Sequence, residues 1–581
     1  MPISTRPFLL THPVAVLRLS VRGLLTIFMG VMSLAGCTAH PEVRAGSNRP
    51  QVVTSSVSVS DLQTQAEQAL GEANYLKASR LLVRIAQLSE DEEVISEAAQ
   101  LCYQSNQLQA ALQIAQRWLV INPTNLQARE IAALSAIKLY QVDLSVEHLQ
   151  TLIDQAYVTP AAGFIDWLDK IPVTDANAAL AVMKKLASVR PQMAEAQYAV
   201  ARLAELTEDY GAMQIYAQRA HDLSPYWAPA GLALAKSQLL SGHADLALKT
   251  GQAVVVNDDS LGTRSEYAGL LLAAGKSDEA IQLWQELEQT EGDHNVAVRS
   301  LAYLDIQLGN YQSAFNRLNG LLNSGNKVGE TIFYLAGIAQ QMGATAEARQ
   351  LFGRVQEGPL AIPAQVRIAY LIKDSEGLES ALQSLELYAE TNTEQAVAVL
   401  EARAQMLADA GDDAAALALY DSGVRDYPDV AALQLARAFQ LTKMNKWSSG
   451  IQAMREVLRK RPEDPTLLNA LGFTMLDHTK QYEEAYGYIK AALSATPDSS
   501  AVMDSMGWAL YKLGRKQEAL GYLQAASKKM QDHELQFHLG EVLWSLNRRD
   551  EALSAWQQGL KFQPDNQALQ ERLKRATDVH E

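Results

Sequence analysis

Apolar and polar positions near the end of the chain follow a pattern that recurs after 33 residues. The runs MGWAL at 506–510 and KQEAL at 516–520 are matched by LGEVL at 539–543 and RDEAL at 549–553. Each copy holds a large residue beside a glycine, then a polar break, then an acidic residue followed by alanine and an apolar residue. This spacing predicts two short antiparallel helices that pack closely where their side chains are small. Pro564 follows the second copy, and it predicts the end of that helix because proline lacks the amide donor.

The small residue of the predicted second helix recurs along most of the chain. At intervals of 33 to 35 residues before and after Ala519, every position has a small side chain except Met213. The series consists of Ala78, Ala111, Ser145, Ala179, Met213, Ala247, Ala280, Ala314, Ala348, Ala381, Ala416, Gly450, Ala485, Ala519 and Ala552.

Proline keeps the same period independently of this series. Three prolines in the first half are 68 and 34 residues apart, and three in the second half are 34 and 35 apart. They are Pro123, Pro191 and Pro225, then Pro428, Pro462 and Pro497. Two residue types that hold one period predict a repeat array, and a non-repetitive helical bundle is the alternative.

A period near 34 with small residues at these positions resembles the tetratricopeptide repeat. The resemblance implies an all-α fold: a tetratricopeptide-repeat solenoid of about 15 helix pairs that forms a superhelix, with a C-terminal capping helix. We expect the array to occupy residues 61–565, with Asp61 as the N-cap of its first helix, and the capping helix and tail to occupy residues 566–581. Extra residues around Gly358 and at 391–393 predict local irregularities.

The N-terminal region has the features of a lipoprotein signal peptide. Three arginines precede an apolar run at 23–34, which is too short to span a bilayer of about 30 Å. The run ends in LAGC at 34–37, which resembles the bacterial lipobox, in which the cysteine is acylated. We therefore expect a signal peptide at 1–36 and lipidation of Cys37. An ordinary secretory signal with an incidental cysteine is the alternative.

The residues after the cysteine predict a tether and a location. Residues 38–60 contain few large apolar side chains and many Ser, Thr, Pro and Gly residues, so we expect a flexible tether over 37–60. Thr38 follows the cysteine. By resemblance to the sorting rule of enteric bacteria, a residue other than aspartate there implies an outer-membrane lipoprotein that faces the periplasm.

The charge of the chain narrows its possible partners. The 581 residues carry a net charge of −16, and the acidic residues are scattered among the basic ones. Nucleic-acid binding draws much of its affinity from Lys and Arg at phosphates, so we expect no nucleic-acid partner. Membrane contact is expected through the lipid anchor alone. The partners that remain are proteins.

Candidate catalytic and metal chemistry is sparse. Cys102 occupies an apolar position of the repeat, so we interpret it as a buried hydrophobic residue rather than a reactive thiol. His533 and His538 are five residues apart and would point about 140° away from each other on a helix, which disfavours a shared metal ion. Glu534, His538 and Glu541 would share a helix face, which we interpret as a solvated surface. We predict a protein that is not an enzyme, with no cofactor, no metal and no catalytic residues.

A candidate partner-binding surface comes from the tetratricopeptide resemblance. In that family positions 2, 5, 9 and 12 of each first helix point to the concave face. In the clearest repeats of this chain they carry large aromatic residues with a few polar groups, as hot spots of protein interfaces do. The alternative is that the aromatic residues pack against neighbouring side chains or the capping helix. The predicted surface comprises Asn469, Phe473, Asp504, Trp508, Tyr511, Phe537, Glu541 and Trp544.

The C-terminal third, with the phrases LNALGFT at 468–474 and MDSMGWALY at 503–511, resembles a group of proteobacterial tetratricopeptide lipoproteins. Length, lipobox and repeat span are similar to those of members that partner a periplasmic carboxy-terminal processing protease. This resemblance implies a non-catalytic adaptor that binds the protease and presents peptidoglycan hydrolases as substrates. Alternatives are a scaffold for an envelope-assembly, exopolysaccharide or pilus secretion machine, and an enzyme with an unrecognised site.

Overall fold

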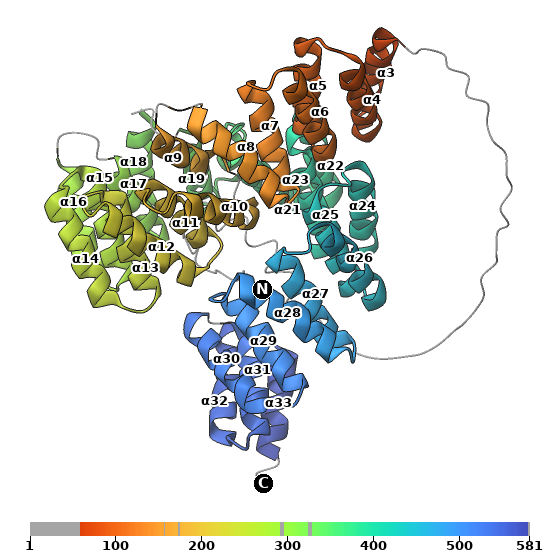
Figure 1. The fold of residues 1–581 in the computed structure, drawn as a ribbon. Helices are drawn as coiled ribbons and strands as arrows, with labels where there is room; N and C mark the ends of the chain where they lie inside the picture. The colour runs from red at the N-terminus through yellow and green to blue at the C-terminus, as the bar shows by residue number, and fades with distance from the viewer. Residues whose placement is uncertain are drawn as a thin grey trace, which may run out of the picture.

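The computed structural model describes residues 58–578, except residues 156, 158, 172–174, 291–294, 324–327 and 531. Within this part of the chain every regular element is a helix: thirty-one α-helices and one 3-10 helix, η2 (Thr393–Gln395). The helices form the predicted tetratricopeptide-repeat solenoid, which winds into a superhelix (Figure 1). The predicted signal peptide, Cys37 and most of the predicted tether lie outside the described residues.

Thirty of the α-helices form fifteen consecutive two-helix repeats. Repeats 1 to 5 are α3 (Val59–Gly71) and α4 (Tyr75–Leu88), α5 (Glu92–Gln104) and α6 (Leu108–Ile121), α7 (Leu126–Lys138) and α8 (Val142–Gln155), α9 (Pro160–Lys170) and α10 (Ala176–Val189), and α11 (Ala194–Leu206) and α12 (Tyr210–Leu223). Repeats 6 to 10 are α13 (Ala228–Leu240) and α14 (Ala244–Asn257), α15 (Leu261–Ala273) and α16 (Ser277–Glu288), α17 (Asn295–Gln307) and α18 (Tyr311–Asn323), α19 (Val328–Gln341) and α20 (Thr345–Phe352), and α21 (Ala361–Glu376) and α22 (Leu378–Thr391).

The C-terminal third continues the same order and ends in a single helix. Repeats 11 to 15 are α23 (Ala396–Asp409) and α24 (Asp413–Asp426), α25 (Ala431–Lys443) and α26 (Trp447–Lys460), α27 (Pro465–His478) and α28 (Tyr482–Ala495), α29 (Ser500–Lys512) and α30 (Lys516–Lys529), and α31 (His533–Ser545) and α32 (Arg549–Phe562). The last helix, α33 (Gln567–Asp578), packs on α32 and buries Leu569 and Ala576, so it caps the array.

The predicted small-residue series is confirmed as the contact between paired helices. Each of its fifteen members is the fourth residue of the second helix of its repeat, and each is buried. Ala519 of α30 faces Gly507 of α29, where an added Cβ would lie 3.2 Å from the carbonyl oxygen of Ala519 and 2.5 Å from Cγ of Leu523. The glycine and the alanine together therefore allow the two backbones to approach closely.

The polar breaks predicted between the paired helices are tight turns. Gly514 has φ 80° and Asn547 has φ 63°, and both follow the first helix of their repeat. This left-handed conformation is open to glycine and is tolerated by asparagine, which accounts for the residue types at the breaks.

The fourth repeat departs from the regular pairing. Its helix α9 packs mainly on α8 and α11, whereas α10 packs on α7, α8 and α11. The connection between α9 and α10 runs from residue 171 to 175, longer than the three-residue turns of repeats 1 and 2. The longer connection lets the two helices separate, although Ala179 of α10 stays fully buried.

The predicted N-cap of the first helix is corrected by three residues. The first helix begins at Val59, and its N-cap is Ser58 rather than Asp61. The Ser58 hydroxyl accepts from the Asp61 amide at 3.1 Å, and the Asp61 carboxylate accepts from the Ser58 amide at 3.3 Å. This reciprocal arrangement is a capping box, in which the acidic residue stands at the third helical position.

Both irregularities predicted inside the array are present. After α20, which has only eight residues, the chain follows a non-helical path through Gly358 before α21 begins. The residues 391–393 lie where α22 ends and η2 begins. In both places the extra residues are accommodated between repeats rather than inside a helix.

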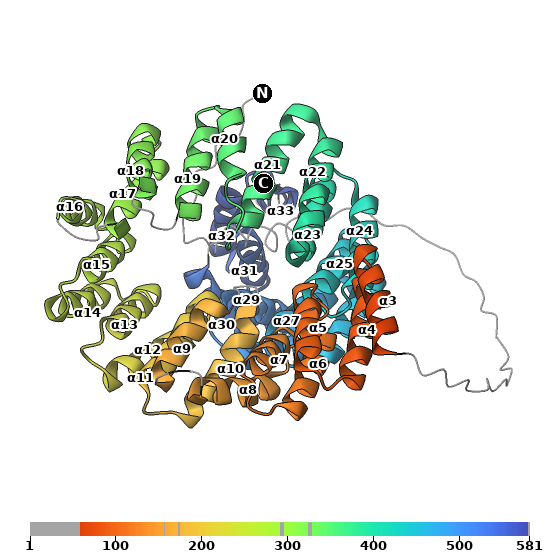
Figure 2. The same ribbon diagram turned by 90° about the horizontal axis from the view of Figure 1, so that it is seen from above.

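The superhelix curves so far that its first repeats meet repeats 11 to 13. Viewed from above, it surrounds a central axis, and in repeats 6 to 8 the first helices lie nearer the axis than the second helices (Figure 2). The start of α6 in repeat 2 contacts the loop between α24 and α25. Repeats 14 and 15 and α33 continue beyond this contact towards the C-terminus (Figure 1).

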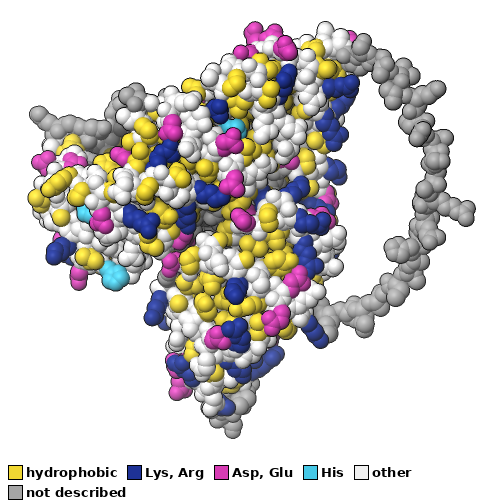
Figure 3. All heavy atoms as spheres, viewed as in Figure 1, with side chains coloured by type: hydrophobic (Ala, Val, Ile, Leu, Met, Phe, Trp, Pro, Cys, Tyr) yellow, Lys and Arg dark blue, Asp and Glu magenta, His cyan; other side chains and the backbone are white. Residues whose placement is uncertain are grey.

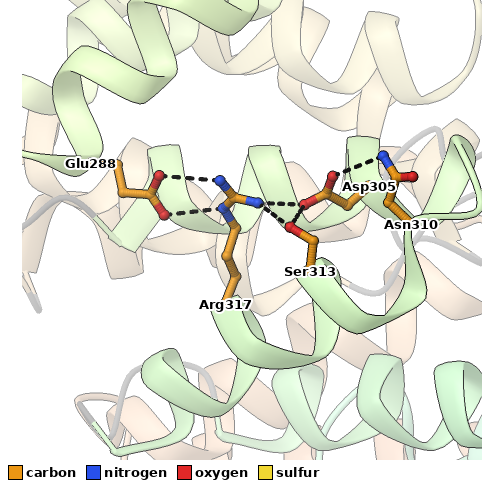
Figure 4. Close-up of polar contacts among 5 residues, drawn as sticks. All are labelled: Glu288, Asp305, Asn310, Ser313 and Arg317. Atoms are coloured by element: carbon orange, nitrogen blue, oxygen red, sulfur yellow. Dashed lines mark hydrogen bonds and ion pairs between the residues drawn. The ribbon is translucent and has the colours of Figure 1, made fainter.

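An ion-pair network shows how neighbouring repeats are also joined by polar contacts (Figure 4). Arg317 of α18 holds Glu288 of α16 through two hydrogen bonds, with Nε 3.0 Å from Oε1 and Nη2 3.3 Å from Oε2. The same guanidinium pairs with Asp305 of α17, whose carboxylate also accepts from Ser313 at 2.7 Å. Because the guanidinium is planar and rigid, one arginine fixes three helices relative to one another.

Overpacking the helix crossing should destabilise the fold locally. Ala519→Leu places three extra carbons where Ala519 has no exposed surface, and we expect a cost of about 1–3 kcal/mol. Hydrogen exchange of the α29 and α30 amides, followed by mass spectrometry, measures this loss. Ala491→Leu is the matched control, because Ala491 is exposed on the equivalent helix α28. Equal protection in the two variants would contradict the role of the small-residue series.

Candidate protein-binding surface

The eight residues of the predicted surface lie on three successive first helices, α27, α29 and α31, which contact one another. Helix α29 is capped by Ser499, whose hydroxyl accepts from the amide of Val502. Helix α31 is capped by Asp532, whose carboxylate accepts from the amides of Glu534 and Leu535. These caps fix the start of each helix and thereby the height of its side chains in the stack.

Trp508 is the centre of an aromatic cluster. Its ring stacks on His538 with centroids 4.2 Å apart and on Tyr511 with centroids 5.1 Å apart. The ammonium of Lys512 lies 4.5 Å from the Trp508 ring, and the indole Nε1 donates to Oδ1 of Asp477 at 2.8 Å. Trp508 is only 7% exposed, so most of its surface is already used within the protein.

His538 and Asp504 form a buried acid–base pair between α29 and α31. His538 Nδ1 lies 2.9 Å from Asp504 Oδ1, and the imidazole is 2% exposed. Burial alone would lower the pKa of His538, but the charge and hydrogen bond of the Asp504 carboxylate outweigh it and raise that pKa to about 9. Burial raises the pKa of the neighbouring Glu534 to about 7. The pair therefore holds two repeats together through a charged imidazolium at neutral pH.

The last repeat and the capping helix share a second polar contact. Glu541 of α31 is 6% exposed and pairs with Arg572 of α33. The Arg572 guanidinium also lies 6.0 Å from the ring of Trp556, whose centroid is 5.6 Å from that of Trp544. Glu541 and Trp544 thus contribute to the attachment of the cap.

The structure divides the predicted surface into two groups. Asp504, Trp508 and Glu541 are buried and have partners within the chain, as the alternative interpretation proposed for the aromatic residues. The remaining five are half-buried and keep part of their surface: Asn469, Phe473, Tyr511, Phe537 and Trp544. These five residues are the accessible part of the predicted surface.

His538 is buried rather than solvated. The interpretation of Glu534, His538 and Glu541 as a solvated face is wrong, because His538 and Glu541 are covered by the neighbouring helices α29 and α33. One signal was available: Asp504 and His538 are separated by 34 residues, one repeat, so they stand at similar heights on adjacent first helices. Among the described residues, no three His, Cys, Asp or Glu side chains are arranged to hold a metal ion.

The predicted burial of Cys102 is confirmed. Its side chain has no exposed surface, and burial raises the pKa of the thiol to about 12. A thiol with this pKa stays protonated at neutral pH and is a poor nucleophile.

The outer surface mixes charges of both signs with apolar side chains over the face seen in Figure 3. In the part of the chain that the structure describes, none of the helices combines the length and apolar character needed to cross a bilayer.

The fold is that of a protein-interaction scaffold, since tetratricopeptide solenoids typically bind other proteins. The sequence model of the tetratricopeptide repeat matches residues 505–568, within repeats 14 and 15 and the start of the cap. The chain is 30% identical over 209 residues to the TPR repeat-containing protein PA4667 of Pseudomonas aeruginosa. That match covers 36% of this chain and 35% of the relative, so it spans about a third of the curated relative's length.

Solved structures that resemble this chain include other tetratricopeptide proteins. A tetratricopeptide repeat protein from Parabacteroides merdae is 14% identical, with a TM-score of 0.33 over 43% of this chain and 98% of its own. Yeast Tom70 is 12% identical, with a TM-score of 0.35 over 90% of this chain and 96% of its own. These likenesses are too weak to support a conclusion about function.

The buried pair should make the stability of the C-terminal repeats depend on pH. The pKa of His538 is raised on folding, so its contribution is complete below about pH 6.5 and is lost as pH rises through about 9. The raised pKa of Glu534 acts in the same direction between about pH 4.5 and 7. We expect His538→Gln to destabilise α29 and α31 more at pH 6 than at pH 9.5, by about 1–3 kcal/mol. Hydrogen exchange corrected for its intrinsic pH dependence measures the difference, and an equal loss at both pH values would contradict the pairing.

Proposed function

We propose that this protein is a non-catalytic adaptor, lipid-anchored at the outer membrane and facing the periplasm. In this proposal it binds a carboxy-terminal processing protease and promotes the proteolysis of peptidoglycan hydrolases. The observation that carries the proposal is the long array of fifteen repeats. Half-buried aromatic residues lie on the first helices of its last three repeats, α27, α29 and α31. The LAGC run at 34–37 and the resemblance of the C-terminal third to adaptor lipoproteins support the location and the partner.

Such an adaptor acts by proximity rather than by chemistry. A protease and its substrate that bind one scaffold meet at an effective concentration set by the scaffold, and the gain reaches about 10² to 10⁴ without new contacts. The array offers separate surfaces for both, because each repeat contacts mainly its neighbours and leaves its other faces available.

The adaptor should accelerate degradation by an added protease. We expect the purified protein alone to cleave nothing, and the rate of hydrolase loss to rise when it is mixed with a carboxy-terminal processing protease. Loss of substrate on a gel, with protease alone and with protease plus scaffold, measures the effect. Equal rates would reject the protease-adaptor function and leave a scaffold for an envelope-assembly or secretion machine as the next hypothesis.

The accessible aromatic residues should contribute to partner binding. Tyr511→Ala with Phe537→Ala removes two half-buried rings but leaves Trp508 and its hydrogen bond to Asp477 in place. We expect weaker binding of at least one partner by about 1–3 kcal/mol, with unchanged helicity. Calorimetric titration with protease and with hydrolase measures it. Tyr522→Ala is the matched control, because Tyr522 is an exposed aromatic on the outer helix α30 of the same unit.

The membrane anchor should depend on Cys37 alone. Cys37 lies outside the described residues, and lipidation remains a proposal based on the lipobox resemblance. We expect Cys37→Ser protein to leave the membrane fraction and keep its helical content, because an acyl chain is the device that would hold it there. Sedimentation with washed membranes and circular dichroism measure the two effects. A Cys37→Ser protein that still sediments with membranes would contradict the anchor.

A further inference from the structure

Repeats far apart in the sequence touch where the superhelix overlaps itself. Gln107 at the start of α6 donates to the carbonyl oxygen of Asp426 at 2.8 Å, although 319 residues separate them. Tyr75 stacks on Tyr427 with ring centroids 6.3 Å apart. We call this contact between repeats 1–5 and repeats 11–13, with the loops that follow them, the seam.

The seam uses one position of each second helix in repeats 2 to 5. The second helical residues of α6, α8, α10 and α12 are Gln109, Asp143, Asn177 and Gly211, spaced 34 residues apart. Asp429 accepts from the backbone amide of Gln109 at 3.0 Å, and Asn177 donates to Oγ1 of Thr466 at 3.1 Å.

Glycine stands where the approach is closest. The carboxylate of Asp498 lies against Gly211, so a Cβ at this position of α12 would collide with it. At the remaining position, Asp143 of α8 and Glu463 line a common cleft. The same helical position therefore faces the second turn of the superhelix in all four repeats.

Acidic residues supply the opposite side of the seam. In the loops after repeats 11, 12 and 13, proline is followed by Asp429, Glu463 and Asp498. The loop prolines of repeats 2, 4 and 5 are followed instead by Thr124, Gln192 and Tyr226. Helix N-termini carry unsatisfied amides and a partial positive charge, which carboxylates stabilise. Asp429 replaces the side-chain cap that α6 lacks at Gln107.

An arginine of the seam contacts a helix C-terminus, which carries a partial negative charge. Arg461, from the loop after repeat 12, donates to the carbonyl oxygen of Lys138, the last residue of α7. Burial lowers the pKa of Arg461, and the carboxylates of Asp464 and Asp175 counteract it. The seam thus pairs acids with helix N-termini and an arginine with a helix C-terminus.

The seam is joined mainly by polar contacts, unlike the contacts between consecutive repeats. A cleft of about 340 Å³ opens to solvent beside these contacts, lined by Tyr140, Val142, Lys185, Pro462 and Glu463 among others. Consecutive repeats instead share continuous apolar cores, as repeats 12 to 15 do. Charge–dipole contacts are weak and are screened by salt, whereas apolar burial is not.

We propose that the seam is a clasp that opens without unfolding of the repeats. Closed, it joins repeats 1–5 to repeats 11–13 and makes the superhelix a ring around its axis. Open, it separates the two turns and gives a partner lateral access to the inner helices. The shape change belongs to the chain itself, so it holds whether or not the protease-adaptor function does.

The test compares shapes of the full chain carrying Cys37→Ser. Asp429→Lys with Asp498→Lys removes two charge–dipole contacts, and we expect the closed population to fall relative to the open one by about threefold to thirtyfold. Small-angle X-ray scattering should show a larger radius of gyration, with unchanged helicity by circular dichroism. Asp550→Lys with Asp565→Lys is the control with the same change of charge at exposed positions outside the seam, and we expect the wild-type radius.

A cross-link gives a second readout. Asn177→Cys with Thr466→Cys places two thiols where the native side chains are in contact, and Cys102 is buried and does not compete. We expect a disulfide to form under mild oxidation, more slowly at 1 M salt and when Asp429→Lys and Asp498→Lys are added. An unchanged radius together with an unchanged cross-linking rate would overturn the clasp. Loss of helicity in the Asp429→Lys/Asp498→Lys protein would overturn it as well, because the seam would then be part of the folding unit.

Discussion

Close approach of two helix backbones, repeated fifteen times along the chain, is the constraint on which the structure depends. The fourth residue of each second helix has no room for a large side chain, and Met213 is the single large exception. Glycines such as Gly507 and Gly540 make the matching space on the first helix. Because the crossing is similar in each repeat, small rotations from one repeat to the next add up to a superhelix.

The repeat architecture was predictable because it is encoded locally. The spacing of Ala519 and its equivalents depends on contacts within one repeat, and one sequence window contains both partners. The first N-cap was missed by three residues, since Ser58 and Asp61 both suit a cap and the choice depends on their reciprocal hydrogen bonds. The separation of α9 from α10 was not predicted from the repeat pattern either. Ala179 keeps its position in the small-residue series, although α10 packs on α7, α8 and α11.

The candidate site was less predictable for a different physical reason. Whether a side chain on a first helix is accessible depends on the helices of adjacent repeats and on the cap, which the pattern of one helix does not contain. Trp508 therefore had the correct position for a binding residue but is enclosed by His538, Tyr511 and Lys512. Charged residues at such positions stabilise the contacts between repeats. The Asp504–His538 pair joins the last two repeats, and the Glu541–Arg572 pair joins the last repeat to the cap.

Contact between the two turns of the superhelix also limits the number of repeats that the array can contain. A solenoid with contacts only between neighbours tolerates gain or loss of a repeat, because every junction is equivalent. Here Gln109 meets Asp429 and Gly211 faces Asp498, and the number of repeats between them sets whether those residues coincide. Insertion or deletion of one repeat in the middle of the array would shift the two rows by one unit and place Asp429 and Asp498 opposite the wrong helices. The length of repeats 6 to 10 is thus fixed by geometry, as the circumference of a ring fixes the number of its segments.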